Sequence, residues 1–311
     1  MKHLTWTWII IALLWGQGVH GQGWTKTYYG IENWGGVQQT TDGGYIVAGK
    51  GYGGLSLLKT SNNGDSLWHK DTYLGYDEEV FYDVKQTTDG GYIATGRLDQ
   101  YSNNKFFSCL VKTNATGDTI WTKSYKFGGL DNSMNSVEQT TDGGFITAGR
   151  IYDLAANGGT NGYIIKTDSN GDTIWTKSYN RSGSFIDVFL DIEQTSDGGY
   201  LAAGTAFDST SSKTHVIKLN STGQLQWAKS YDAGDGYGVG IIQSTNGDYL
   251  FYGHNAAIKT DVNGDTLWTR TINQLTPSVP PNSTAFFHNN PPFTGTNNKD
   301  YITEILPAEV W

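Results

Sequence analysis

An eleven-residue phrase recurs along the chain and restricts the folds that it can adopt. Gln-Thr-Thr-Asp-Gly-Gly-Tyr-Ile-Val-Ala-Gly occupies residues 39–49, and related phrases occupy 86–96, 139–149, 194–204 and, more loosely, 243–253. A second phrase, close to Ile-Lys-Thr-x-x-x-Gly-Asp-Thr-x-Trp, ends each unit at Trp68, Trp121, Trp175, Trp227 and Trp268. The Asp-Gly-Gly positions and their last variant, Asn246, are separated by 47, 53, 55 and 49 residues. Such periods are typical of propeller blades and other repeat arrays.

Each unit has the composition of four short strands. In the third unit, β-branched and aromatic residues predict strands at 136–139, 144–149, 163–167 and 172–179. The intervening Thr-Asp-Gly-Gly and Ser-Asn-Gly-Asp sequences suit tight turns, because Asp, Asn and Gly accept positive φ at low steric cost. No unit has sustained helical spacing, and no proline precedes Pro277. We therefore expect an all-β fold, a β-propeller of four-stranded antiparallel blades, with the recurrent tryptophans packed between blades.

The repeated phrases also carry a family resemblance. Residues 39–49 and the stretch Ile-Ile-Lys-Thr-Asp-Ser-Asn-Gly-Asp-Thr-Ile-Trp-Thr-Lys-Ser-Tyr at 164–179 resemble the repeats of large secreted β-propeller proteins of Bacteroidetes and related bacteria. The resemblance covers about residues 24–270. It implies a propeller that is cargo of type IX secretion, and it implies no reaction. Members commonly end in a carboxy-terminal sorting domain, which is not evident in this sequence.

The amino terminus predicts export. Residues 1–21 combine Lys2, an apolar stretch at 6–15 and the small-residue pattern Val19-His20-Gly21, as in a secretory signal peptide. A membrane span needs about 17–25 apolar residues, more than this stretch offers. We expect a mature chain beginning at Gln22, secreted or held at the cell surface. The single cysteine, Cys109, excludes an internal disulfide and is expected to be buried.

Charge and histidine spacing exclude several kinds of partner. A net charge of −9 argues against a nucleic-acid partner and against an anionic membrane surface. His69, His215, His254 and His288 are not at metal-ligand spacing, and the Asp168–Asp172 turn lacks the pattern of a calcium loop. We expect no metal, no cofactor and no membrane span in the mature chain, and we expect a monomer.

The two ends of the chain leave the number of blades open between two interpretations. Residues 22–271 hold the repeats, and residues 24–29 match the outer-strand phrase at 121–125. The tail, 272–311, contains a faint three-strand pattern at 284–288, 293–296 and 301–306, together with all six prolines. It is either a degenerate sixth blade, closed by the amino-terminal strand, or a proline-rich linker. We favour the sixth blade, because an unpaired first strand would leave an exposed edge.

Functional residues are expected on the connections that differ between units, since function often lies on variable loops of a rigid frame. These connections span 51–54, 98–105, 151–161 and 206–213 within units, and 72–82, 126–134, 180–187 and 232–238 between them. They hold aromatic and acidic residues, which suit sugars because rings stack on C–H surfaces while carboxylates accept hydroxyl groups. The candidate ligand-binding residues are Tyr52, Tyr76, Asp77, Tyr101, Tyr152, Phe185, Asp187 and Tyr237.

Three functions remain open from the sequence. The leading one is a secreted non-catalytic propeller that binds a polysaccharide or a cell-surface protein through the variable loops. A polysaccharide hydrolase would use two acidic loop residues, for example Asp77 and Asp187. A structural spacer within a larger surface protein is the third, in which the loop aromatics only anchor their own loops.

Overall fold

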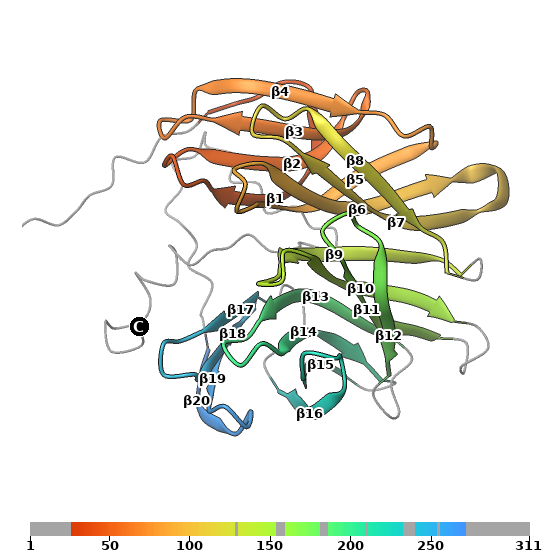
Figure 1. The fold of residues 1–311 in the computed structure, drawn as a ribbon. Coiled ribbons are helices and arrows are strands. Elements are labelled where there is room, and N and C mark those ends of the chain that lie inside the picture. Colours follow the sequence, from red (N-terminus) through yellow and green to blue (C-terminus); the bar gives the residue numbers. More distant parts are fainter. Residues whose placement is uncertain are drawn as a thin grey trace, which may run out of the picture.

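The computed structural model describes residues 26–127, 130–153, 159–180, 186–208, 211–232, 240–253 and 256–271. These residues form a β-propeller fold in which five four-stranded antiparallel blades follow one another along the chain (Figure 1). A single parallel bridge, between Thr160 and Ile186, joins blades 3 and 4. The only helix among the described residues is a 3-10 turn, η1 (Tyr101–Asn103).

Each blade contributes four strands in chain order. Blade 1 comprises β1 (Ile31–Gln39), β2 (Tyr45–Gly51), β3 (Gly54–Thr60) and β4 (Ser66–Thr72), and blade 2 comprises β5 (Glu78–Gln86), β6 (Tyr92–Gln100), β7 (Lys105–Thr113) and β8 (Thr119–Tyr125). Blade 3 comprises β9 (Asn132–Gln139), β10 (Phe145–Asp153), β11 (Gly159–Thr167) and β12 (Thr173–Tyr179). Blade 4 comprises β13 (Ile186–Gln194), β14 (Tyr200–Phe207), β15 (Ser212–Leu219) and β16 (Leu225–Tyr231), and blade 5 comprises β17 (Gly240–Gln243), β18 (Tyr249–Tyr252), β19 (Ala256–Thr260) and β20 (Thr266–Thr271).

The expected all-β class and four-stranded antiparallel blades are confirmed, but strand β9 is longer than predicted. It begins at Asn132 rather than at residue 136. Its first four residues contain no β-branched or aromatic residue, and the polar ones among them, Asn132, Ser133 and Asn135, are buried. Asn132 uses its side-chain oxygen to accept the amide and hydroxyl of Ser108 in the neighbouring strand β7, at 3.0 and 2.6 Å. These side-chain hydrogen bonds compensate for burial of the polar group.

In blades 2, 3 and 4 the last glycine of the repeated phrase is required by a bulge in the innermost strand. The pairing of β5 with β6 shifts between Phe81 and Asp83, which brings the Val80 carbonyl against Gly96. A Cβ atom at Gly96 would lie 1.9 Å from that oxygen. Gly149 and Gly204 stand equally close to carbonyl oxygens in blades 3 and 4. Any larger residue would therefore displace the inner strand.

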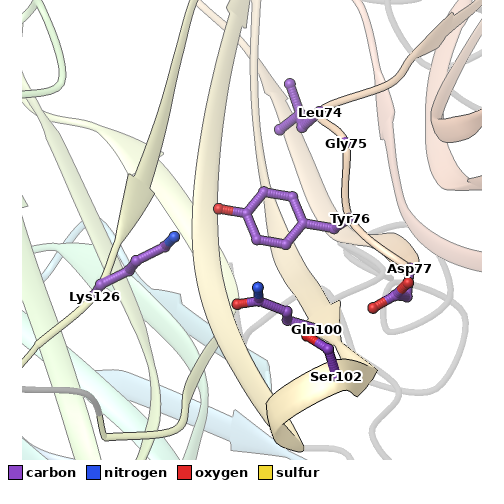
Figure 2. A pocket seen from close by; sticks show the side chains of 7 residues that line it. All are labelled: Leu74, Gly75, Tyr76, Asp77, Gln100, Ser102 and Lys126. Atoms are coloured by element: carbon purple, nitrogen blue, oxygen red, sulfur yellow. The ribbon is translucent and has the colours of Figure 1, made fainter.

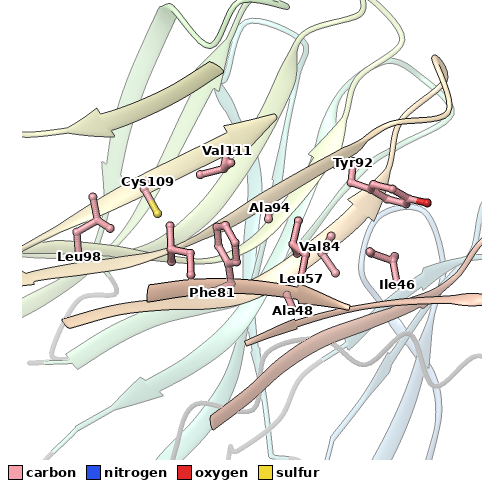
Figure 3. Close-up of a cluster of buried hydrophobic side chains, with 11 residues drawn as sticks. Ile46, Ala48, Leu57, Phe81, Val84, Tyr92, Ala94, Leu98, Cys109 and Val111 are labelled. Carbon is pink, nitrogen blue, oxygen red and sulfur yellow. The ribbon is translucent and has the colours of Figure 1, made fainter. Parts of the chain in front are cut away.

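Blades pack through their faces, and the tryptophans lie between them as expected. Figure 3 shows the cluster between blades 1 and 2, in which Ile46, Ala48 and Leu57 meet Phe81 and Val84. At the outer edge, the tryptophans of the first four units cover the positive-φ glycine of the next blade's Asn-Gly-Asp-type turn, so that a Cβ atom there would displace the indole ring. The pairs are Trp68 with Gly117, Trp121 with Gly171, Trp175 with Gly223 and Trp227 with Gly264.

The charged residues of the repeat stabilise turns. Asp42 accepts the Thr40 hydroxyl and the Gly44 amide, and it pairs with Lys59 at 2.9 Å. Hydrogen bonds from Thr40 and Lys59 hold the pKa of Asp42 at about 2. The same lysine–aspartate pair recurs as Lys112 with Asp89, Lys166 with Asp142 and Lys218 with Asp197. The most regular charges of the sequence thus belong to the scaffold.

The segment before β1 repeats a contact between blades. Lys26 pairs with Asp65 at 2.9 Å, and the Tyr28 hydroxyl donates to the Gly64 carbonyl at 2.6 Å. Lys123 and Tyr125 of β8 bind Asp172 and Gly171 of blade 3 in the same manner. Residues 26–28 therefore lie against blade 1 as an outer strand lies against the following blade. The predicted signal segment 1–21 and the tail 272–311 are outside the described residues. Within the described residues, no helix has the length and apolar character needed to cross a membrane.

Candidate ligand-binding face

The antiparallel strand order separates two kinds of connection. In each blade the first-to-second and third-to-fourth connections lie at one end of the sheet, and these are the uniform turns. The second-to-third connections and the passages between blades lie at the opposite end, where the sequence differs from unit to unit. We call this end the variable-loop face. Turns also bind the neighbouring blade, since the Gln86 side chain accepts the Thr41 amide at 2.8 Å.

A cavity of about 420 Å³ lies on the variable-loop face of blade 2. It is formed by the passage from β4 to β5, by the η1 turn and by the residue that follows β8 (Figure 2). We call it the blade-2 pocket. Its lining residues are Leu74, Gly75, Tyr76, Asp77, Gln100, Ser102 and Lys126. In Figure 2 the Tyr76 ring lies between Lys126 on one side and Asp77 on the other.

A buried carboxylate holds the first wall of the pocket in place. Glu79 is 2 % exposed, and its oxygens accept the Leu74 amide at 2.8 and 3.0 Å and the Tyr76 amide at 2.9 Å. A carboxylate that accepts several backbone N–H groups fixes a loop firmly, because charge-assisted hydrogen bonds are stronger than neutral ones. Glu79 was not predicted from the sequence. It is the second of two successive glutamates at the start of β5, and nothing in the sequence distinguishes it from Glu78.

Two predicted residues, Asp77 and Tyr101, are brought together at the second wall. The Tyr101 amide donates to Asp77 at 2.6 Å, and the Tyr101 hydroxyl donates to Glu78 at 2.7 Å. Lys50 of blade 1 also binds Glu78, at 2.9 Å. Hydrogen bonds from Lys50 and Tyr101 lower the pKa of Glu78. This network joins η1 to the β4–β5 connection and favours the ionised form of Glu78.

Lys126 supplies a positive charge at the third wall. Its ammonium lies 4.8 Å from the centre of the Phe107 ring and 5.4 Å from that of Tyr76. The two rings meet edge to face, with centres 6.5 Å apart. No carboxylate in the described part of the chain pairs with Lys126. The pocket thus offers a tyrosine ring with an ammonium, an amide, a hydroxyl and a carboxylate around it, which suits a polyhydroxylated ligand.

The other predicted residues lie on different blades or are buried. Tyr52, 81 % exposed, is in the β2–β3 turn, and Tyr152, 40 % exposed, is near the end of β10. Asp187 is in β13 and only 2 % exposed. Phe185 and Tyr237 are outside the described residues. Of the eight candidates, the structure brings Tyr76, Asp77 and Tyr101 together.

A second group of ionisable side chains lies on the first strands of the blades. Asp83 of β5 accepts the Val137 amide of β9 at 3.1 Å, and Asp191 of β13 accepts the Ile241 amide of β17 at 2.9 Å. Burial raises the pKa of Asp83 to about 6 and that of Glu138, which also faces Glu193, to about 8. Lys85 pairs with Asp83 at 3.5 Å. These groups join neighbouring blades at their first strands, and they were not predicted from the sequence.

The described residues contain no group of three or more His, Cys, Asp or Glu side chains arranged to hold a metal ion. His69 instead binds Ser56 at 2.6 Å and Asp71 at 3.2 Å, and His215 lies 3.3 Å from Ser230. His254 and His288 are outside the described residues. Cys109 is buried, and burial raises the pKa of its thiol.

Comparison with known proteins supports the fold. No protein-family model matches the chain, and no curated protein sequence matches it. Among solved structures, a protein of unknown function from Bacteroides caccae is similar, with a TM-score of 0.51 and 14 % identity over 80 % of this chain and 84 % of the other. A streptogramin B lyase is similar with a TM-score of 0.52 and 12 % identity, over 81 % of this chain and 72 % of the other. At such identities the similarity concerns the fold alone.

Proposed function

We propose that this chain is a secreted, non-catalytic β-propeller that binds a glycan through its variable-loop face, with the blade-2 pocket as the contact. The observation that carries the proposal is the Tyr76 ring, placed between Asp77 and Lys126 beside Gln100 and Ser102. An aromatic face packs on the C–H surface of a sugar, while the surrounding polar groups bind its hydroxyls. A hollow of this kind favours a small glycan segment over a flat protein surface.

The carboxylates near the pocket favour binding over hydrolysis. Glycosidases use two carboxyl groups on opposite sides of the scissile bond, one of which is protonated to act as the acid. Asp77 is the carboxylate that lines the pocket, and it already accepts the Tyr101 amide. Glu78 is bound by Lys50 and Tyr101, which lower its pKa and oppose a role as an acid. Asp187, the second acid of the hydrolase hypothesis, is buried in β13.

Export and ring closure belong to the same proposal. The segment 1–21 directs secretion, in keeping with the resemblance to type IX cargo, and the protein acts outside the cell or at its surface. Residues 24–29 form the outer strand of a sixth blade whose remaining strands come from 272–311. The contacts of Lys26 with Asp65 and of Tyr28 with Gly64 support this arrangement, because full blades contact their neighbours in the same way.

A polysaccharide panel tests the glycan proposal. Purified residues 22–311 are incubated with neutral and acidic polysaccharides, and both binding and released reducing ends are measured. We expect binding without release, and we expect Tyr76→Ala to abolish it. Tyr73→Ala is the matched control, since Tyr73 is 70 % exposed on the same connection but does not line the pocket. Steady release of reducing ends would establish the hydrolase instead, and equal binding by both variants would exclude the blade-2 pocket.

A further inference from the structure

Arg150 in β10 is a partly buried cation with few partners. Its Nε donates to the Ser133 hydroxyl at 3.3 Å, and within the described ranges the guanidinium has no carboxylate partner. A guanidinium has five N–H donors, and among the described residues Ser133 is the acceptor of a hydrogen bond from one of them. Burial lowers the pKa of Arg150, the nearby Tyr82 raises it and Arg97 lowers it. A partly desolvated charge without a counter-ion is unfavourable unless it serves another purpose.

In blades 1 and 2 the basic residue equivalent to Arg150 has a carboxylate partner. In blades 1, 2 and 3 the glycine of the opening phrase is followed by Lys50, Arg97 and Arg150. Lys50 pairs with Glu78 at 2.9 Å, and Arg97 pairs with Asp99 at 2.7 Å. Blade 3 keeps the basic residue, but no carboxylate of the described residues pairs with it.

In blade 3 a tyrosine occupies the position that the carboxylate of Asp99 has in blade 2. Asp99 stands two residues after Arg97, hence on the same face of β6. The residue two positions after Arg150 is Tyr152, which is 40 % exposed. The Tyr152 amide donates to the Asp131 carbonyl at 2.7 Å, which anchors the end of the strand. Blade 3 therefore presents a guanidinium and an accessible aromatic ring on one face of β10, toward the variable-loop end.

We infer that Arg150 and Tyr152 form a subsite for a carboxylate-bearing sugar, a uronic acid unit of a polysaccharide. The guanidinium fork binds the two oxygens of the sugar carboxylate, and this carboxylate takes the part that Asp99 plays for Arg97. The Tyr152 ring packs against the C–H face of the sugar. This inference names the substrate class for the variable-loop face, and in that respect it rests on the proposed function. The subsite itself is built by blade 3 and shares no residue with the blade-2 pocket.

The test is calorimetric titration of the mature protein with an oligogalacturonate and with the same oligomer as its methyl ester. We expect the acid to bind at least roughly tenfold more tightly than the ester, because one charge-assisted pair is lost in the ester. Arg150→Gln should remove this preference. Lys213→Gln is the control of equal charge, since Lys213 pairs with the exposed Asp232 on blade 4. It should leave the preference unchanged.

Arg150→Lys and Tyr76→Ala separate the outcomes. Arg150→Lys keeps the charge but not the fork and should retain only part of the preference, and circular dichroism checks that each variant is folded. Equal affinity of wild type and Arg150→Gln for the acid would overturn the subsite, as would equal affinity of wild type for acid and ester. If neutral glycans then bind in a Tyr76-dependent manner, the proposed function stands without the subsite. If the uronate binds through Arg150 and Tyr76→Ala has no effect, the subsite stands and the pocket assignment fails.

Discussion

The Tyr28 hydroxyl donates a hydrogen bond of 2.6 Å to the carbonyl oxygen of Gly64, in the turn between β3 and β4. Tyr125, Tyr179 and Tyr231 make the same bond to the turn glycine of the blade that follows each of them. Tyr28 precedes blade 1, so it takes the place of the last tyrosine of a preceding blade. This relationship ties the amino-terminal segment to the scaffold and makes its contribution measurable.

Replacing Tyr28 tests that contribution. Tyr28→Phe removes the hydroxyl and leaves the ring, so we expect a loss of about 1 kcal/mol in the free energy of unfolding, the usual net value of such a hydrogen bond. The measurement is urea denaturation of the mature chain. Tyr29→Phe is the neighbouring control, because Tyr29 is 91 % exposed. Identical midpoints for the two variants would mean that the segment does not stabilise blade 1.

Substitutions at two glycines, Gly117 and Gly90, measure how much the packing of Trp68 on the next blade contributes to stability. Gly117 and Gly90 both have φ of +81°, but a Cβ at Gly117 would lie 2.7 Å from the Trp68 ring, whereas a Cβ at Gly90 would meet nothing within 4 Å. Gly90→Ala should cost about 1–2 kcal/mol from backbone strain alone. Gly117→Ala should cost a further ~1–3 kcal/mol, because Trp68 must move. Thermal unfolding of both variants checks this, and equal costs would contradict the stacking of Trp68 on the turn.

The buried Glu138 predicts a pH dependence of stability. Burial, and then the charge of Glu193, raises its pKa in the folded protein to about 8, against about 4.3 in an unfolded chain. Since the folded state holds the proton more tightly, this contribution is fully present below pH ~4 and is lost as the pH rises through 8. Glu138→Gln should therefore flatten the stability profile between pH 5 and 8 and stabilise the protein by about 2 kcal/mol at pH 8. Denaturation at several pH values measures the slope, and an unchanged slope in the variant would show that Glu138 does not hold the proton.

Glu79 should determine the order of the pocket wall. Glu79→Ala removes the acceptor of the Leu74 and Tyr76 amides, so we expect those two amides to exchange hydrogen much faster. The amide of Thr87, which binds the Gly91 carbonyl in a uniform turn of the same blade, serves as the internal reference. Glycan affinity should fall with the loss of order at Tyr76. Unchanged protection at Leu74 and Tyr76 would show that Glu79 is not required for the wall.

Part of the candidate site could be predicted from the sequence, and part could not. Tyr76, Asp77 and Tyr101 were identified because aromatic and acidic residues stand out in connections that differ between units. Gln100, Ser102 and Lys126 were not, since nothing in a loop sequence indicates that separate connections meet around one cavity. Asp187 illustrates the opposite error, because a carboxylate expected on a variable connection lies buried inside β13.

The all-β blades, their order and their turns could be predicted from the amino-acid sequence, because they depend on local chemistry. Glycine at positive φ, aspartate in a turn and alternating apolar residues act over a few residues, and they recur in each repeat. Which loops share a cavity and which charges are paired became known from the folded structure. Arg97 and Arg150 are alike in sequence, yet one has a carboxylate partner and the other does not. That difference arises from distances between side chains and from burial, which strand periodicity does not encode.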